Sequence, residues 1–316
     1  MTQRLTRRHW MLLAGSGLLA ACSGTSQQLI VQKGLVPPAW LRRLPRSWRA
    51  EPMDWSEALP AWPQASRCLA LTDGWAMANQ SLPPQAWPQD ALAGLLPLAQ
   101  PLLPYGLPVG FGPWLLVLRN RRDLLADGGV DRGWSLLLDP SLRGELLLPA
   151  SPRVVQEIAR RIGDTEASVA RLRQQAIGFG DRDALTLLLH GDAQAAVLPS
   201  RAVIPQLSRD TRLQALLPDS GAPLWWALLQ QTAQGKAPPL EWLLDPRRSP
   251  LLDQLLRAGF TPPLERPVLE PALARQPHAE LLLPAAAVLQ RCTTLLPLAP
   301  EPVSYTHLRA HETCTN

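Results

Sequence analysis

The sequence predicts an α/β protein in which short strands alternate with helices. Apolar runs typical of buried strands recur along the chain, and segments with helical start and stop signals lie between them. The 34 prolines among 316 residues are scattered along the chain. Because proline disrupts helix interiors, their distribution excludes a long helical bundle or coiled coil. The alternation is typical of mostly parallel sheets covered by helices, and the length suggests about two domains.

The first half of the chain contains three predicted strands. Apolar runs predict them at 29–31, 68–71 and 114–118. A proline in its first turn predicts a helix over 37–44, and another helix is expected over 75–80. The glycine-proline run at 110–113 predicts a turn directly before the third strand.

The second half repeats the pattern, with strands predicted at 145–148, 195–198 and 224–229. The clearest helix follows the first of these strands. Ser151 is its expected N-cap, Pro152 its first helical residue and Gly163 the residue just past its end. Further helices are predicted at 184–190, 240–244 and 251–258, and a last one begins at His278.

Residues 1–22 resemble a bacterial export signal. Arg4, Arg7 and Arg8 make its start positive without any acid, and the apolar stretch that follows is too short and too rich in small residues to span a bilayer permanently. An ordinary cleaved signal peptide and a buried N-terminal helix are the alternatives. The segment 6–11 also resembles the twin-arginine consensus, which leaves the export route open.

The end of this signal matches a lipobox, Leu-Ala-Ala-Cys at 19–22. Small residues there admit the signal peptidase, and the Cys22 thiol would then carry a diacylglycerol. We therefore expect an exported, periplasmic lipoprotein that is held to the membrane through Cys22.

The last fourteen residues, 303–316, resemble the translation of a sequencing adapter. Histidine and tyrosine gather there although the rest of the chain has few of either. We therefore leave this tail out of functional reasoning, together with the apparent metal cluster of His307, His311 and Cys314. No metal and no cofactor are expected.

The net charge of +5 shrinks when the two ends are set aside. Three of these charges belong to Arg4, Arg7 and Arg8, and the tail is neutral, so the remaining chain carries +2. That balance gives no electrostatic case for binding nucleic acid. Cys68 and Cys292 are the cysteines left, and we expect two separate buried thiols although an exported compartment would permit their pairing.

Catalytic motifs are missing from the sequence, which contains no P-loop, dinucleotide fingerprint, HExxH or CxxC. His190 is expected to stabilise a helix C-terminus, and His278 is expected to be solvated. An exported hydrolase would have to use Ser200 with His190 and Asp192, a spacing that makes a working triad improbable. We therefore expect that the protein is not an enzyme.

Five blocks in the same order resemble solute-binding proteins of the spermidine/putrescine family, which serve ABC transporters. The strongest is the block 133–149, which reads GWSLLLDPSLRGELLLP and is similar to that family's W-x-x-L-x-D-P-x-x-x-G-x-v-x-l-P pattern. The others are a glycine-acidic turn at 191–197, a P-x-x-G-x-x-x-W-like segment at 217–225, and L-x-x-P and G-Y-x-T-P elements at 243–246 and 258–262.

The resemblance implies a two-lobed periplasmic-binding-protein fold of type II, with crossing hinge strands and a central ligand cleft. Lobe 1 would comprise 23–115 and 226–262, and lobe 2 would comprise 116–225 and 263–302. It also implies an ABC permease and ATPase as partners in transport, with no enzymatic role. A lipid-anchored scaffold or sensor with the same fold and no transport role is the alternative.

The resemblance places the ligand against loops that carry aromatic, serine and arginine side chains. These candidates are Trp75, Phe111, Trp114, Ser151, Arg153, Ser200, Arg201, Trp225 and Trp226. Aromatic walls suit polyamine methylenes, and carboxylates would hold the ammonium groups.

The acids that this family carries are missing from those loops. The segment after residue 149 brings Ser151 and Arg153, and Ala227 stands where an aspartate is expected after Trp225. Arg153 begins a helix, where it favours an anion, or it pairs with Glu157 one turn later. The expected solute is therefore polyamine-like, neutral or carboxylate-bearing, and Asp73 or Asp219 remains a source of a carboxylate. Loss of ligand binding is the alternative.

Overall fold

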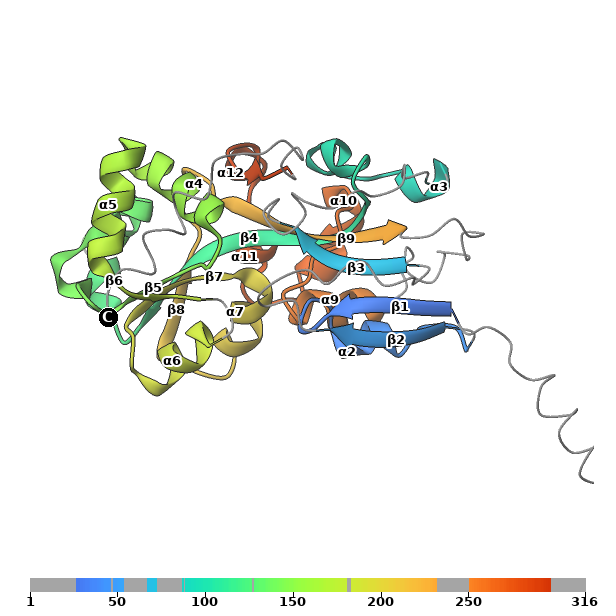
Figure 1. Ribbon diagram of the computed structural model, residues 1–316, viewed down its shortest axis with the longest axis horizontal. Coiled ribbons are helices and arrows are strands. Elements are labelled where there is room, and N and C mark those ends of the chain that lie inside the picture. The colour runs from blue at the N-terminus through green and yellow to red at the C-terminus, as the bar shows by residue number, and fades with distance from the viewer. Residues whose placement is uncertain are drawn as a thin grey trace, which may run out of the picture.

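A mixed ten-stranded sheet forms the centre of the described part of the chain (Figure 1). The computed structural model describes residues 27–46, 48–53, 67–72, 87, 89–126, 128–180, 183–231 and 250–296. The strands are β1 Gln27–Gln32, β2 Trp48–Met53, β3 Arg67–Thr72, β4 Leu107–Arg119, β5 Leu146–Leu148, β6 Ala176–Phe179, β7 Ala195–Pro199, β8 Leu213–Leu216, β9 Pro223–Gln231 and β10 Thr293–Thr294.

Helices flank this sheet on both faces. The α-helices are α2 Pro38–Leu41, α3 Gln89–Leu92, α4 Pro152–Ile162, α5 Thr165–Gln175, α6 Ala184–His190, α7 Ser200–Leu207, α9 Leu251–Arg257, α10 Arg266–Leu273, α11 Ala279–Leu282 and α12 Ala286–Gln290. Four 3₁₀ segments are also described, η2 Pro97–Leu102, η3 Arg122–Leu125, η4 Gly129–Leu138 and η5 Pro140–Leu142.

Strand β4 belongs to both halves of the molecule. Its first part, up to Pro113, pairs with β9, and its second part, from Trp114, pairs with β7 and β8. In Figure 1, β4 and β9 run through the middle, with β5 to β8 and helices α4 to α7 on one side and β1 to β3 on the other. The chain therefore crosses from one half to the other along β4 and returns through the segment that leads into β9.

Alternation along the strands divides the core into two clusters, one on each face of the sheet. On β9, Trp225, Ala227 and Leu229 belong to one cluster, whereas Leu224, Trp226 and Leu228 belong to the other. This separation follows from the period of two residues in a strand. Adjacent tryptophans in the sequence therefore lie in different environments.

Most of the predicted elements that lie within the described residues are confirmed. Strand β7 and helices α4 and α6 have nearly the predicted bounds, and α6 ends at Gly191 with φ 97°, a left-handed conformation that suits glycine. The helix predicted over 37–44 is shorter, since α2 covers Pro38–Leu41. The helices predicted at 75–80 and 240–244, the export signal with Cys22 and the tail lie outside the described residues.

The expectation of mostly parallel sheets is corrected to a mixed sheet. β1 runs parallel to β2 and β3, and β5 runs parallel to β6 and β7. β9 is antiparallel to β3 and β4, and β4 is antiparallel to β7 and β8. The antiparallel pairs arise because β4 and β9 carry the chain between the halves.

The turn predicted at 110–113 is wrong, because these residues lie inside β4. A Cβ on Gly110 would lie 2.0 Å from the Phe260 ring, and a Cβ on Gly112 would lie 2.2 Å from Ser200 Oγ. The glycines let neighbouring groups approach the strand closely and do not reverse the chain.

Helices long and apolar enough to cross a membrane are not found among the described residues. Across the same ranges, no group of three or more His, Cys, Asp or Glu side chains gathers in a metal-binding arrangement.

Candidate functional site

Two helix N-termini lie side by side at one edge of the sheet. Strands β5 and β7 are parallel neighbours with Leu146 opposite Ala195, so the segments with Ser151 and Ser200 leave the sheet at the same end. Ser151 is the N-cap of α4, and Ser200 is the first residue of α7. Carboxyl ends of parallel strands are where α/β sheets bind ligands, and we take this edge as the candidate site.

Ser200 is joined to strand β9 through Trp225. The Trp225 indole Nε1 donates a hydrogen bond of 3.0 Å to Ser200 Oγ, and both side chains are fully buried. The next residue, Arg201, places its guanidinium 5.8 Å from the Trp225 ring centroid. The structure thus brings three predicted site residues, Ser200, Arg201 and Trp225, into one cluster.

Arg201 also links the two sides of the crossing strands. Its Nη1 donates a hydrogen bond of 2.6 Å to the carbonyl oxygen of Gly34, in the turn between β1 and α2. The contact joins the first turn of α7 to the segment that follows β1. The guanidinium therefore lies between the two halves of the sheet.

Two further aromatic residues, neither of them among the predicted ligand contacts, complete this cluster. Phe260 lies 5.9 Å from Trp225 and 5.5 Å from Trp40, measured between ring centroids. Both Trp40 and Phe260 are buried. The motif G-Y-x-T-P predicted an aromatic at 260 but not its neighbours, and nothing local in the sequence marks Trp40.

The α4 side of the site contains a buried hydroxyl. Ser151 is 7% exposed, and its Oγ has no hydrogen-bond partner among the described residues. Nearby, Arg153 Nη1 donates a hydrogen bond of 2.7 Å to the carbonyl oxygen of Leu296, which follows β10. Both arginines that the sequence placed at this edge therefore bind backbone carbonyl oxygens, Arg153 in the segment after β10, which pairs with the crossing strand β9, and Arg201 in the turn after β1.

The sequence left open that Arg153 pairs with Glu157, and the described ion pairs of Glu157 involve other arginines. Glu157 instead pairs with Arg160 and Arg161, each at 2.8 Å, and accepts a hydrogen bond of 2.6 Å from Thr293 Oγ1. Burial by itself would raise the pKa of Glu157, but the hydrogen bonds from Arg160 and Thr293 and the charge of Arg161 outweigh it and lower that pKa. Burial lowers the pKa of Arg161.

Trp114 lies on the same face of the sheet as Trp225. On β4 it is opposite Pro199, the residue before Ser200, and its side chain is 2% exposed. Its indole Nε1 has no partner among the described residues. Trp114 therefore adds a second buried donor without an acceptor to the strands that carry the site.

Phe111 and Trp226 lie on the opposite face. Their rings stack at a centroid distance of 5.0 Å and an interplanar angle of 20°, and both are fully buried. The structure thus separates this pair from Ser200, Arg201 and Trp225. Trp75 and Asp73 lie outside the described residues, and Asp219 is exposed.

The arrangement that a hydrolase would need is not present among the described hydrogen bonds. Ser200 is fully buried and its hydroxyl oxygen accepts from Trp225, whereas His190 is exposed at the end of α6.

Cys292 is buried and free of any disulfide, and burial raises the pKa of its thiol.

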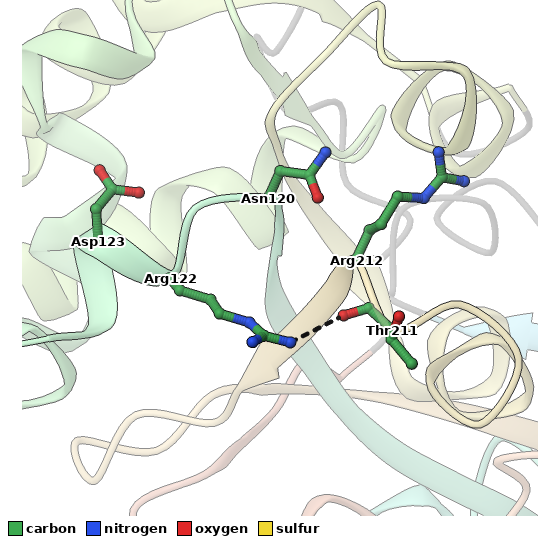
Figure 2. A pocket seen from close by; sticks show the side chains of 5 residues that line it. All are labelled: Asn120, Arg122, Asp123, Thr211 and Arg212. Carbon is green, nitrogen blue, oxygen red and sulfur yellow. Dashed lines mark hydrogen bonds between the residues drawn. The ribbon is translucent and has the colours of Figure 1, made fainter.

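A separate open pocket of about 490 Å³ lies at the far end of β4 (Figure 2). Its lining residues are Asn120, Arg122, Asp123, Thr211 and Arg212. Arg122 donates a long hydrogen bond of 3.5 Å to the Thr211 carbonyl oxygen, and Arg212 is paired with Asp210 at 2.6 Å. The pocket contains no residue that the sequence predicted as a ligand contact.

Solved structures show the same fold. Comparison with protein-family models and with curated protein sequences gives no match. A spermidine/putrescine ABC transporter substrate-binding protein from Streptococcus pneumoniae is similar over 90% of this chain and 96% of its own, with a TM-score of 0.64 and 11% identity. The TpPotD lipoprotein of Treponema pallidum is similar over 90% and 98%, with a TM-score of 0.67 and 12% identity.

A third similar structure is a complex with agropinic acid. The periplasmic binding protein AgtB from A. tumefaciens R10, in complex with agropinic acid, is similar over 85% of this chain and 92% of its own, with a TM-score of 0.56 and 12% identity. Sequence identities this low establish the fold alone. The chain therefore has the type II periplasmic-binding-protein fold, which it shares with substrate-binding proteins of ABC transporters.

Proposed function

We propose that this protein is the lipid-anchored substrate-binding protein of an ABC importer, which captures a small solute between its two halves. The observation that carries the proposal is the position of the Ser200, Arg201 and Trp225 cluster. It lies where α7 begins at the carboxyl end of β7, next to strand β9, through which the chain re-enters the other half. A cleft between two halves is where a binding protein of this fold closes on a solute.

The contacts of Arg153 and Arg201 support a closure between the halves. Arg201 on α7 donates to the Gly34 carbonyl oxygen after β1, on the other side of the crossing, and Arg153 on α4 donates to the Leu296 carbonyl oxygen after β10, which pairs with the crossing strand β9. Hydrogen bonds from a charged donor are stronger than those between neutral groups. A solute that enters between these segments would add its own contacts to both sides, so binding would favour the closed arrangement.

Copurified solute provides a direct test of capture. The mature chain would be purified from its native host without dialysis, and native mass spectrometry would compare its mass before and after denaturation. We expect an added mass that leaves on unfolding. A chain that never carries a solute, yet stays on the membrane, would support the scaffold or sensor alternative instead.

Anchoring is tested through the lipobox cysteine. Cys22→Ser removes the thiol that would carry the lipid. We expect the wild-type chain in the membrane fraction and the variant in the soluble periplasmic fraction, with Cys292→Ser as a matched control that leaves the distribution unchanged. Equal membrane association of the Cys22→Ser variant would contradict lipid anchoring.

A further inference from the structure

The candidate site offers hydrogen-bond donors that have no acceptor. Trp114 Nε1 can only donate, and Ser151 Oγ carries a hydroxyl hydrogen, and neither atom has a partner among the described residues. Ser200 Oγ already accepts from Trp225, which leaves its own hydrogen to be donated. A buried donor without an acceptor costs free energy, so these groups point to a ligand that accepts.

The three donors come from neighbouring strands. β4 pairs with β7 and β7 pairs with β5, so the three strands are adjacent. Ser200 and Ser151 follow the carboxyl ends of β7 and β5, and Trp114 lies in the middle of β4. Trp114 is opposite Pro199, and the segments with Ser151 and Ser200 leave the sheet at the same end. Adjacent strands are about 4.8 Å apart, so one small acceptor group can reach donors from more than one strand.

The electrostatics of this edge favour negative charge. The eleven-residue helix α4 and the eight-residue helix α7 both begin here, and the first backbone N–H groups of a helix lack partners within it. Arg153 and Arg201 lie in the first turns of these helices and add two positive charges. Glu157, the acid nearest along α4, is held by Arg160, Arg161 and Thr293.

A polyamine fits this edge poorly. Ammonium groups donate and do not accept, so they would meet donors and positive charge where they need carboxylates. A carboxylate has two oxygens that accept several hydrogen bonds and carries the complementary charge.

We propose that the edge formed by Ser151, Arg153, Ser200, Arg201 and Trp114 binds the carboxylate group of a small organic acid. This inference rests on the proposed function and adds to it the chemical class of the solute.

The test compares acids with their amides on the mature chain. Acetate, succinate, citrate and L-glutamate would be added at equal ionic strength, each beside its amide counterpart, with spermidine as the cationic probe. At a concentration 100-fold above Kd, an acid that binds should raise Tm by about 5 °C or more, and its amide should not.

Matched variants locate the site. Ser151→Ala removes a buried hydroxyl without a partner, so the ligand-free Tm should not fall, while the shift caused by the acid should drop by at least half. Arg153→Gln should reduce the shift as well. Ser208→Ala and Arg173→Gln change exposed serine and arginine residues outside the site, and both should retain the full shift.

Each contrary outcome has a separate meaning. Stabilisation by spermidine or by an amide, with none by the acids, would overturn the carboxylate assignment and leave the proposed function standing. A full acid shift in Ser151→Ala would also overturn the assigned site. No shift with any probe overturns the carboxylate assignment, and the further absence of a copurified solute would overturn the proposed function too.

Discussion

The Trp225 indole donates a 3.0 Å hydrogen bond to Ser200 Oγ, and this bond lies against Gly112 of strand β4. A Cβ on Gly112 would lie 2.2 Å from Ser200 Oγ and 2.9 Å from Trp225 Nε1. The absent side chain of a residue on β4 therefore makes room for the bond that joins α7 to β9. The relationship connects three elements that are far apart in the sequence.

Gly112→Ala should destabilise the protein by about 1–3 kcal/mol, because the added methyl group overpacks a fully buried site. Urea denaturation of the mature chain measures the loss. Gly180→Ala is the matched control, since a Cβ there meets nothing within 4 Å. Equal midpoints for the two variants would contradict the close packing of Ser200 and Trp225 against β4.

Trp134→Phe should cost about 1–3 kcal/mol, since it removes a buried hydrogen bond and leaves an acceptor unpaired. Trp134 is 1% exposed and its Nε1 donates a bond of 2.8 Å to the Gly221 carbonyl oxygen. Trp226→Phe is the control, because that buried indole N–H has no partner among the described residues. If both substitutions lower the unfolding free energy equally, the bond to Gly221 contributes nothing.

Glu157→Gln should lower the unfolding free energy by about 3 kcal/mol, because Arg161 is 5% exposed and would lose its charged partner. The exposed acid Glu166 on α5 provides the control substitution Glu166→Gln, which should change stability by less than about 0.5 kcal/mol. Thermal and urea unfolding would measure both. Arg161 also donates hydrogen bonds of 2.7 Å to the Ser220 carbonyl oxygen and to Thr293 Oγ1. A Glu157→Gln variant as stable as the control would show that these two bonds hold Arg161 without the carboxylate.

The stability contribution of Asp139 should depend on pH. Hydrogen bonds from Ser141 and Arg132 lower the pKa of Asp139 from 3.8 to about 2. A lowered pKa means that the native state favours the ionised carboxylate, so its stabilisation is complete above the unfolded value and is lost as pH falls from about 4 to 2.

Asp139→Asn removes that dependence. Urea midpoints of the wild-type chain and the variant, measured in steps between pH 2 and 6, should differ most at the upper end and converge at the lower end. A difference that stays constant across this range would mean that the charge of Asp139 makes no contribution. Glu166→Gln again serves as the exposed control.

Cys292 should resist alkylation in the native protein. It is 7% exposed, and burial raises the pKa of its thiol, so little reactive thiolate is present at pH 8. Iodoacetamide labelling followed by peptide mass spectrometry should find Cys292 unlabelled until urea unfolds the chain. Rapid labelling of the native protein would contradict the burial of this residue.

In the block 133–149, which resembles the spermidine/putrescine family, the residues with described contacts have structural roles. Trp134 binds the Gly221 carbonyl, Asp139 caps the 3₁₀ segment η5 through Ser141, and Gly144 has a left-handed φ of 75°. These roles explain why the block predicts the fold well. They also explain why it carries little information about the ligand, since none of these residues lies at the site edge.

The sequence by itself determined many of the local elements and the start of α4, whereas it did not predict the helix α7 that begins at Ser200. Apolar runs, the Ser-Pro start of α4 and the glycine that ends α6 act within a few residues, so they can be interpreted without the rest of the chain. The serines and arginines at 151–153 and 200–201 were named as candidates through the resemblance to the spermidine/putrescine family, which orders the same blocks along the chain.

Only the tertiary structure decided which residues lie against these elements and candidate site residues. It put the glycines at 110–113 inside β4, assigned Trp225 and Trp226 to opposite faces, and supplied Trp40 and the carbonyls of Gly34 and Leu296. These contacts join residues more than a hundred positions apart in several cases. Because such approaches depend on how strands pair and not on local propensity, no short stretch of sequence encodes them.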